Sequence, residues 1–209
     1  MKNINERDQS KGYIPLRLII RDNMNNINKY FSYNSKVILS FFFICLVLLI
    51  IDYITAHKLS RFLSLKRGSI INPMTYIRMI TNSFVSKDWN HFHSNFIYIL
   101  LLGPMLEEKY GSIAILKMML ITSLVSSLIV LLFSNKGALG ASDITFMMIV
   151  LSSVVNIQGG KIPITLVLII LFYVADEVVK QILHLNDNIS HLAHLAGAVC
   201  GFIFGFYMF

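Results

Sequence analysis

Residues 189–209 have the sequence ISHLAHLAGAVCGFIFGFYMF, an apolar run long enough to cross a bilayer as a helix. His194 lies roughly 8 Å below the start of this run, at about 1.5 Å of rise per residue. Gly197, Gly201 and Gly205 follow at a four-residue spacing, which lets two helices approach closely. Because ionisable side chains at membrane depth usually mark functional sites, the run predicts a closely packed transmembrane helix with a working histidine.

Similar apolar runs fill most of the chain, which has 209 residues and is 56% hydrophobic. Runs of about 18 mostly apolar residues predict membrane spans. We therefore predict an all-α integral membrane protein, with residues 37–209 forming a six-transmembrane-helix bundle. The connections after the second span are short, so consecutive helices should be neighbours. The expected spans are Val37–Tyr53, Phe92–Leu106, Ile113–Phe133, Ala138–Val155, Ile162–Val179 and Ile189–Phe209.

A basic arm, residues 1–36, precedes the first span, with seven Lys or Arg against three Asp or Glu. Short basic flanks stay in the cytoplasm, so we expect a cytoplasmic N-terminus in a multi-pass protein of the bacterial plasma (inner) membrane. The net charge of +7 does not indicate nucleic-acid binding, because the arm's basic residues suit anionic lipid headgroups of the bilayer. Residues 57–90 would then be external, although they carry six Lys or Arg.

The orientation of the spans places their polar residues on one side of the membrane. With the N-terminus inside, the second, fourth and sixth spans all run from outside to inside. Their N-terminal ends hold His91 and Asn95, then Ser142, then His194. We therefore expect these four side chains to lie at a similar depth near the outer face.

The fourth helix is expected to begin near Ser142, since Gly140 disfavours an earlier start and serine suits a helix N-terminus. From Ser142 to Val155 such a helix is only about 20 Å long, shorter than the roughly 30 Å hydrocarbon core. Its start should therefore lie below the outer surface. A polar loop at that depth is tolerated where it lines a water-filled cavity.

Ser142 and His194 fit the roles of nucleophile and general base. A serine hydroxyl needs a base within hydrogen-bond reach, and histidine titrates near neutral pH. The glycine stripe predicts that the sixth helix packs on the fourth, which would bring His194 to Ser142. Alternatively, the stripe is ordinary helix packing and His194 bonds a carbonyl. His191, one turn earlier and off the stripe, is a competing base.

His91 and Asn95 lie four residues apart, on one face of a helix. Together with the backbone N–H of Ser142 they could hold the oxyanion of a tetrahedral intermediate. The alternative is a structural polar pair that ties the first loop to the second helix.

Other ionisable residues carry weaker signals. His93 is expected at the interface, and His57 and His184 lie in loops or at span ends. Asp176 and Glu177 keep a transporter interpretation open. Neither HExxH nor paired cysteines occur, so we predict no metal and no cofactor, although His191 and His194 have a spacing that could chelate.

At these positions the chain resembles the rhomboid family of intramembrane serine proteases, from about residue 78 to the C-terminus and more weakly upstream. The stretch 91–95 resembles the family's HxxxN motif, and residues 140–142 resemble its GxSG serine motif. Several further positions match in order along the chain: Asn72-Pro73, Arg78, Thr81, Gly103, Glu107, Lys109-Tyr110-Gly111, Phe146, Ala193-His194, Gly197 and Gly201.

The resemblance implies a Ser142–His194 dyad without a third acidic residue, with His91, Asn95 and the Ser142 amide stabilising the oxyanion. It implies that Phe146 supplies a ring on which the base packs. Substrates would be single-span membrane proteins, cleaved in or near their transmembrane segments. Residues 57–90 would form a partly membrane-embedded first loop.

Two positions depart from the family pattern: Ser86 stands where a further histidine is frequent, and Asp143 stands in place of the glycine after the serine. A carboxylate at a close helix crossing could push the fourth and sixth helices apart, and about 1 Å of misplacement can cost a hundredfold in rate. Near His194, it would instead stabilise an imidazolium. The alternative function is accordingly a catalytically impaired pseudoprotease that binds membrane-protein clients.

Overall fold

In the computed structural model, the chain divides into two compact units, Met1–Asn34 and Ser35–Phe209. The structure describes residues 34–65, 72–134, 137–155, 163–175, 178–179 and 191–207. The expected arm, residues 1–36, lies almost wholly outside these ranges, so its placement stays a prediction. The second unit holds the elements discussed below.

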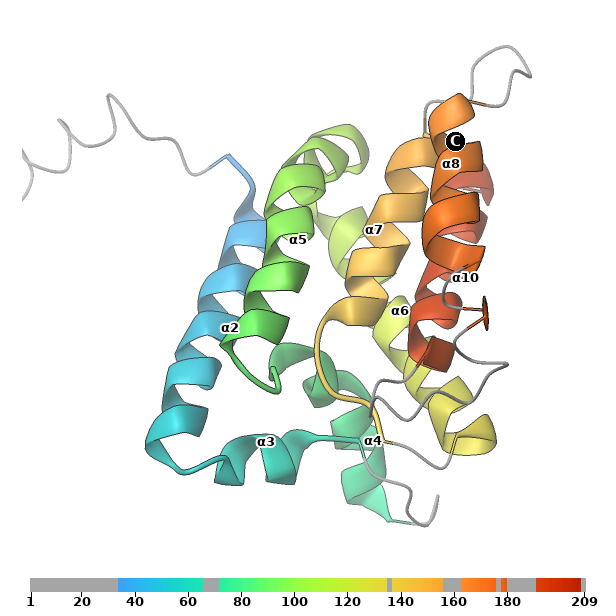
Figure 1. Ribbon diagram of the computed structural model, residues 1–209. Helices are drawn as coiled ribbons and strands as arrows, with labels where there is room; N and C mark the ends of the chain where they lie inside the picture. The colour runs from blue at the N-terminus through green and yellow to red at the C-terminus, as the bar shows by residue number, and fades with distance from the viewer. Residues whose placement is uncertain are drawn as a thin grey trace, which may run out of the picture. The chain divides into compact units, whose positions relative to one another are not determined.

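The regular elements among the described residues are helices, and one isolated antiparallel bridge joins Leu65 and Ala138. The helices pack side by side, with shorter helical segments beneath them (Figure 1). In chain order the elements are α2 (Lys36–Ile54), α3 (Lys58–Leu63), α4 (Pro73–Thr81), the 3₁₀ turn η1 (Asn82–Phe84), α5 (Trp89–Tyr110), α6 (Ser112–Phe133), α7 (Ser142–Val154), α8 (Ile164–Ile169), the π-helical turn η2 (Ile170–Val174) and α10 (His191–Tyr207).

Two of the described helices, α2 and α6, are long and apolar enough to cross a membrane. The fourth helix begins at Ser142, as Gly140 predicted, and is only 13 residues long. The expected fifth span, Ile162–Val179, does not form one regular α-helix in its described part, because α8 gives way to the π-helical η2. The all-helical class is confirmed, whereas the number of six spans stays a prediction.

Helix α7 contacts α5, α6, α8 and α10 (Figure 1). Most of its residues are buried because neighbouring helices surround it. Its closest neighbour is α10, where a Cβ added to Gly197 would lie 2.1 Å from the carbonyl oxygen of Asp143, and one added to Gly201 2.3 Å from that of Met147. The glycine stripe therefore packs on the fourth helix, as predicted.

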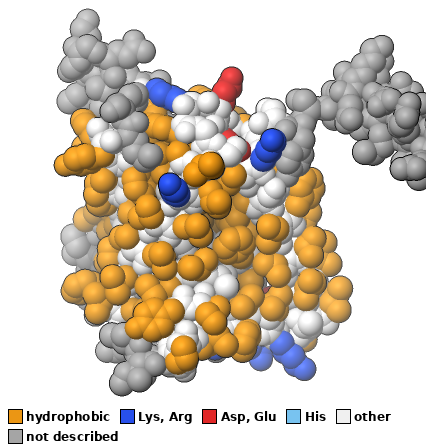
Figure 2. Space-filling view, turned by 180° about the vertical axis from the view of Figure 1, so that it is seen from behind, with side chains coloured by type: hydrophobic (Ala, Val, Ile, Leu, Met, Phe, Trp, Pro, Cys, Tyr) orange, Lys and Arg blue, Asp and Glu red, His pale blue; other side chains and the backbone are white. Residues whose placement is uncertain are grey.

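The outer surface of the unit is strongly apolar. Figure 2 shows hydrophobic side chains spread over the rear face, with charged side chains in its upper part and at its lower edge. Large exposed hydrophobic residues recur along the long helices, for example Ile50 on α2, Leu101 on α5 and Leu128 on α6. Apolar patches of this extent mark contact with a membrane or a partner.

The buried carboxylate of Glu107 is hydrogen-bonded to the backbone at the start of α2. Glu107, one of the positions that match the family pattern, is buried near the end of α5. Its carboxylate accepts hydrogen bonds from the N–H groups of Val37 and Ile38, at 3.0 and 3.1 Å, and from the Ser112 hydroxyl at 2.6 Å. Carboxylates are favoured at helix N-termini, so Glu107 caps α2 and joins it to α5 and α6.

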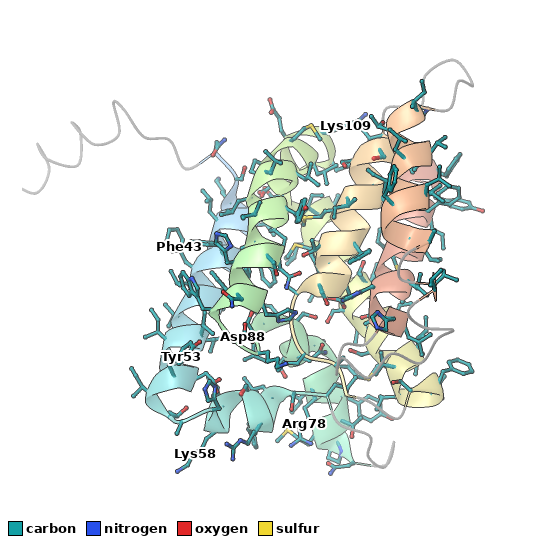
Figure 3. All side chains as sticks on the ribbon, viewed as in Figure 1. Phe43, Tyr53, Lys58, Arg78, Asp88 and Lys109 are labelled. Carbon is teal, nitrogen blue, oxygen red and sulfur yellow. The ribbon has the colours of Figure 1, made fainter. Side chains whose placement is uncertain are left out.

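The two loop residues that match the family pattern, Arg78 and Thr81, tie α4 to α3. The Nε of Arg78 donates to the Phe62 carbonyl at 2.8 Å, and the Thr81 hydroxyl donates to the Leu63 carbonyl at 3.4 Å. Arg78 is labelled in Figure 3, where it lies beside α3. These bonds order the described parts of the first loop beneath the helices.

Candidate active site

A cavity of about 450 Å³ lies where α5, α7 and α10 begin. His91 from α5, Ser142 and Asp143 from α7, and His194 from α10 all line it. The remaining wall comes from the loop 137–140, from Ala193, and from Asn82, Lys87, Asp88, Asn90 and Ser94. The structure thus brings together the starts of the three helices that carry the expected polar residues. Its partly polar wall suits water.

Ser142 is the first residue of α7 and is partly exposed. The first N–H groups of a helix have no intrahelical partner, so its amide is one of the donors at this end of α7. Two residues earlier, Gly140 has a φ of +111°, and a Cβ there would lie 2.2 Å from Cε1 of His91. This turn therefore requires glycine for both its backbone conformation and its space.

The imidazole of His91 packs against Gly140 in the cavity wall. The side chain of Asp88, labelled in Figure 3, accepts the backbone N–H of His91 at 2.8 Å and caps α5. No described residue forms a hydrogen bond with the buried Nδ1 of His91. A ring nitrogen of His91 can therefore serve a ligand as a hydrogen-bond donor.

Asn95 is not among the residues that line the cavity. It is buried one turn further along α5, where its Nδ2 donates to the His91 carbonyl at 2.8 Å. Its Oδ1 accepts from the Thr145 hydroxyl at 3.2 Å. In this arrangement Asn95 links α5 to α7 rather than facing the cavity with His91.

The ring of His194 stacks on Phe146, with centroids 4.6 Å apart and planes 8° from parallel. This contact agrees with the ring expected one turn after the serine. His191 is buried beside His194, with centroids 6.2 Å apart, but it does not line the cavity. Ser142 and His194 line the same cavity.

Asp143 is turned toward α6 as well as lining the cavity. Its carboxylate is buried and accepts hydrogen bonds from the Ser126 hydroxyl and, at 2.9 Å, from the N–H of Ile144. The close approach of α10 involves the backbone carbonyl of Asp143, because that atom faces Gly197. The side chain that departs from the family pattern therefore coexists with a tight α7–α10 contact.

Sequence reasoning missed the polar face of α6, which carries Ser123, Ser126 and Ser127. All three are buried and hydrogen-bonded. Their spacing of three and four residues within an apolar span is the signal that could have identified them. They connect the cavity wall to α4 and η1.

Other residues considered from the sequence do not add to this site. Within the described ranges, no three or more His, Cys, Asp or Glu side chains are grouped so that they could hold a metal. Asp176, Glu177 and His184 lie outside the described residues. The transporter interpretation, which depended on Asp176 and Glu177, therefore stays a prediction.

Comparison with known proteins gives two matches. The rhomboid domain family model matches residues 73–209. The chain is also similar to rhomboid-like protein 11, chloroplastic, of Arabidopsis thaliana, with 25% identity over 146 residues. That match covers 63% of this chain and 52% of the plant protein. The chain thus spans about half the length of this curated relative.

Proposed function

Because the chain belongs to the rhomboid family, we propose that it is an intramembrane serine endopeptidase that uses Ser142 as nucleophile and His194 as general base. The observation that carries the proposal is the shared cavity that these two residues line with His91. The stacking of the His194 imidazole on Phe146 supports it further, since a base must be held in one orientation.

In the first half of the reaction, His194 takes the proton of the Ser142 hydroxyl as Oγ attacks the scissile carbonyl carbon. The tetrahedral intermediate then collapses: the C–N bond breaks, and His194 gives its proton to the leaving amine. In the second half, His194 takes a proton from water, and the resulting hydroxide attacks the acyl-enzyme ester. Breakage of the ester bond returns the proton to Ser142. The polar part of the cavity wall can hold that water.

Two donors are placed to stabilise the oxyanion. The Ser142 amide lies at the start of α7, where the helix dipole favours negative charge. The His91 imidazole shares the cavity and can donate from a ring nitrogen. Asn95 would act through His91, because its amide holds the His91 carbonyl. The mechanism requires no metal or cofactor.

The substrates that we propose are single-span membrane proteins, cleaved in or near the transmembrane segment. The cavity supports this class because it lies among helices whose outer faces are apolar (Figure 2). Rhomboid proteins are embedded in membranes, and we propose the same for this chain, with six spans. The cytoplasmic N-terminus and the bacterial plasma membrane stay predictions; the name of the plant relative assigns that protein to the chloroplast.

A second function, client binding without cleavage, is favoured by one observation. Asp143 stands in place of the motif glycine beside the serine. In such a pseudoprotease the cavity would hold a client segment that the serine does not attack.

Cleavage of a single-span reporter in liposomes separates the two functions. A protease should release product, and Ser142→Ala, His194→Ala and His91→Ala should each lower the rate, with Ser142→Ala abolishing it. His93→Ala is the matched control, because His93 is exposed on the same turn of α5 as His91. Cleavage that survives Ser142→Ala would refute the proposed nucleophile. Wild type that binds the reporter without cutting it, but cuts it as Asp143→Gly, would establish the pseudoprotease.

A further inference from the structure

Asp143 is the residue immediately after the proposed nucleophile, and its carboxylate is only 2% exposed. A buried carboxylate is costly unless it is hydrogen-bonded. Both oxygens are used here: Oδ2 accepts from the Ser126 hydroxyl of α6, and Oδ1 accepts from the Ile144 N–H at 2.9 Å. The carboxylate therefore attaches the first turn of α7 to α6.

Ser126 belongs to a buried polar face of α6 that is itself anchored. Its hydroxyl lies 3.2 Å from the carbonyl oxygen of Ser123, and Ser123 and Ser127 each donate to the Met79 carbonyl at 2.9 Å. Ser127 in turn accepts from Nδ2 of Asn82 at 2.9 Å. The carboxylate is thus held by a helix that cannot easily shift relative to α4 and η1.

The same network also holds the chain on the other side of Ser142. The N–H of Gly140 donates to the carbonyl of Asn82 at 2.9 Å. Gly140 lies two residues before Ser142 and Asp143 one residue after it, so both flanks of the serine connect to the polar face of α6. Because misplacement of a nucleophile by about 1 Å can cost about a hundredfold in rate, such a double attachment has a direct catalytic consequence.

We propose that Asp143 is a positioning residue: held by Ser126, its carboxylate fixes the first turn of α7 and thereby the direction of the Ser142 hydroxyl. The inference rests on the proposed function. The hydrogen bonds of the Asp143 carboxylate to Ser126 and Ile144 assign it this positioning role and not that of a triad acid. In the pseudoprotease alternative, Asp143 would have the opposite effect and would prevent catalysis at the site.

A double-mutant cycle with Ser126→Ala and Asp143→Gly tests the proposal on the full chain in liposomes. Each single change is expected to lower kcat by about tenfold with KM little changed, since the interaction orients the nucleophile and does not touch substrate. Ser126→Ala added to Asp143→Gly should cost little more, because no carboxylate is left to hold. Equal losses from Ser126→Ala in both backgrounds, or unchanged kcat in the single variants, would overturn it.

Three further variants separate positioning from loss of structure. Asp143→Asn and Ser126→Thr keep an acceptor or a hydroxyl and should retain most of the activity. Ser153→Ala removes a buried hydroxyl that bonds only within α7, to the Ile149 carbonyl, and should leave kcat unchanged. Asp143→Asn or Ser126→Thr variants that are folded but as slow as Asp143→Gly would contradict the proposal.

A second readout keeps the inference independent of proteolysis. Ser142→Cys places a thiol at the same position, and its rate of alkylation by iodoacetamide reports how the side chain is presented to the cavity. Ser126→Ala should change this rate in the Asp143 background and leave it unchanged in Asp143→Gly. If the alkylation rate depends on Ser126 only when Asp143 is present, but no variant cleaves the reporter, the protease proposal is refuted and the positioning role is retained. If Ser126→Ala changes the alkylation rate equally in both backgrounds, the positioning role itself is refuted.

Discussion

Replacing Gly197 by alanine should separate the two helices that carry the proposed dyad. A Cβ at this position would lie 2.1 Å from the carbonyl oxygen of Asp143, 2.9 Å from its carbonyl carbon and 3.0 Å from its Cα. An ordinary carbon–oxygen contact is about 3.3 Å, so α10 and α7 would have to move apart by about 1 Å. The obstacle is backbone, which has no rotamer to relieve the clash. Overpacking of this kind costs about 1–3 kcal/mol of stability.

The catalytic effect should exceed the effect on stability. Gly197 lies one turn after His194, and the carbonyl that it meets belongs to the residue after Ser142. The separation therefore acts on the distance between hydroxyl and imidazole, and about 1 Å can cost about a hundredfold in rate. We expect Gly197→Ala to lower kcat/KM for the liposome reporter by about that factor, while thermal unfolding in detergent shows a folded protein.

Two glycines of the same stripe calibrate this experiment. A Cβ at Gly201 would meet the Met147 carbonyl oxygen at 2.3 Å, one turn further from the dyad, so Gly201→Ala should destabilise similarly and slow cleavage less. A Cβ at Gly205 would meet Cγ1 and Cβ of Val154 at 2.4 and 2.7 Å, about two turns beyond Gly197, so Gly205→Ala should have the smallest effect on cleavage. If Gly197→Ala and Gly205→Ala cleave at the same rate, the reasoning from helix separation is wrong.

Three other substitutions test further parts of the structure. Glu107→Gln should lower the free energy of unfolding by about 1–3 kcal/mol, because the neutral amide has one acceptor oxygen where the carboxylate has two; thermal unfolding measures this loss, with the exposed Glu108→Gln as control. Phe146→Leu should lower kcat/KM by up to about tenfold, since ring stacking contributes about 0.5–1.5 kcal/mol; Phe202→Leu on the exposed face of α10 should leave kcat/KM unchanged. Asp52→Asn should lower the unfolding temperature, because the buried carboxylate accepts two hydrogen bonds from the residues after α2; an unchanged temperature would contradict this role.

Local sequence patterns predicted the parts of the fold that depend on backbone chemistry. Gly140 predicted the start of α7 near Ser142. Its φ of +111° is not helical, so α7 cannot extend back through this residue. The spacing of Gly197 and Gly201 identified the face of α10 that packs on α7, since close helix approach requires small residues at that interval. The stacking of His194 on Phe146 followed from the family resemblance.

Local sequence patterns did not predict the contacts between residues that are far apart in the chain. Glu107 caps α2, whose first residues lie about 70 positions earlier in the chain, and no local pattern indicates that pairing. The expected fifth span has the composition of a continuous helix, but apolar residues alone do not distinguish α- from π-helical hydrogen bonding. Asn95 was expected beside His91 at the oxyanion, but it is buried outside the cavity, and its bond with the Thr145 hydroxyl depends on how α5 meets α7.

This fold accommodates Asp143 because, where α7 crosses α10, the lack of space restricts the side chain on α10 and not the one on α7. A residue on α7 meets α10 through its carbonyl, so the opposing position on α10 must lack a side chain, and Gly197 fulfils that condition. The Cβ of Asp143 is not constrained in the same way, because its carboxylate extends to α6 and binds Ser126 there. A glycine at position 143 is therefore not required for the close approach, provided that α6 supplies a hydrogen-bond donor. The effect of replacing Asp143 should accordingly depend on whether Ser126 is present. Gly197 should be required both with aspartate and with glycine at position 143.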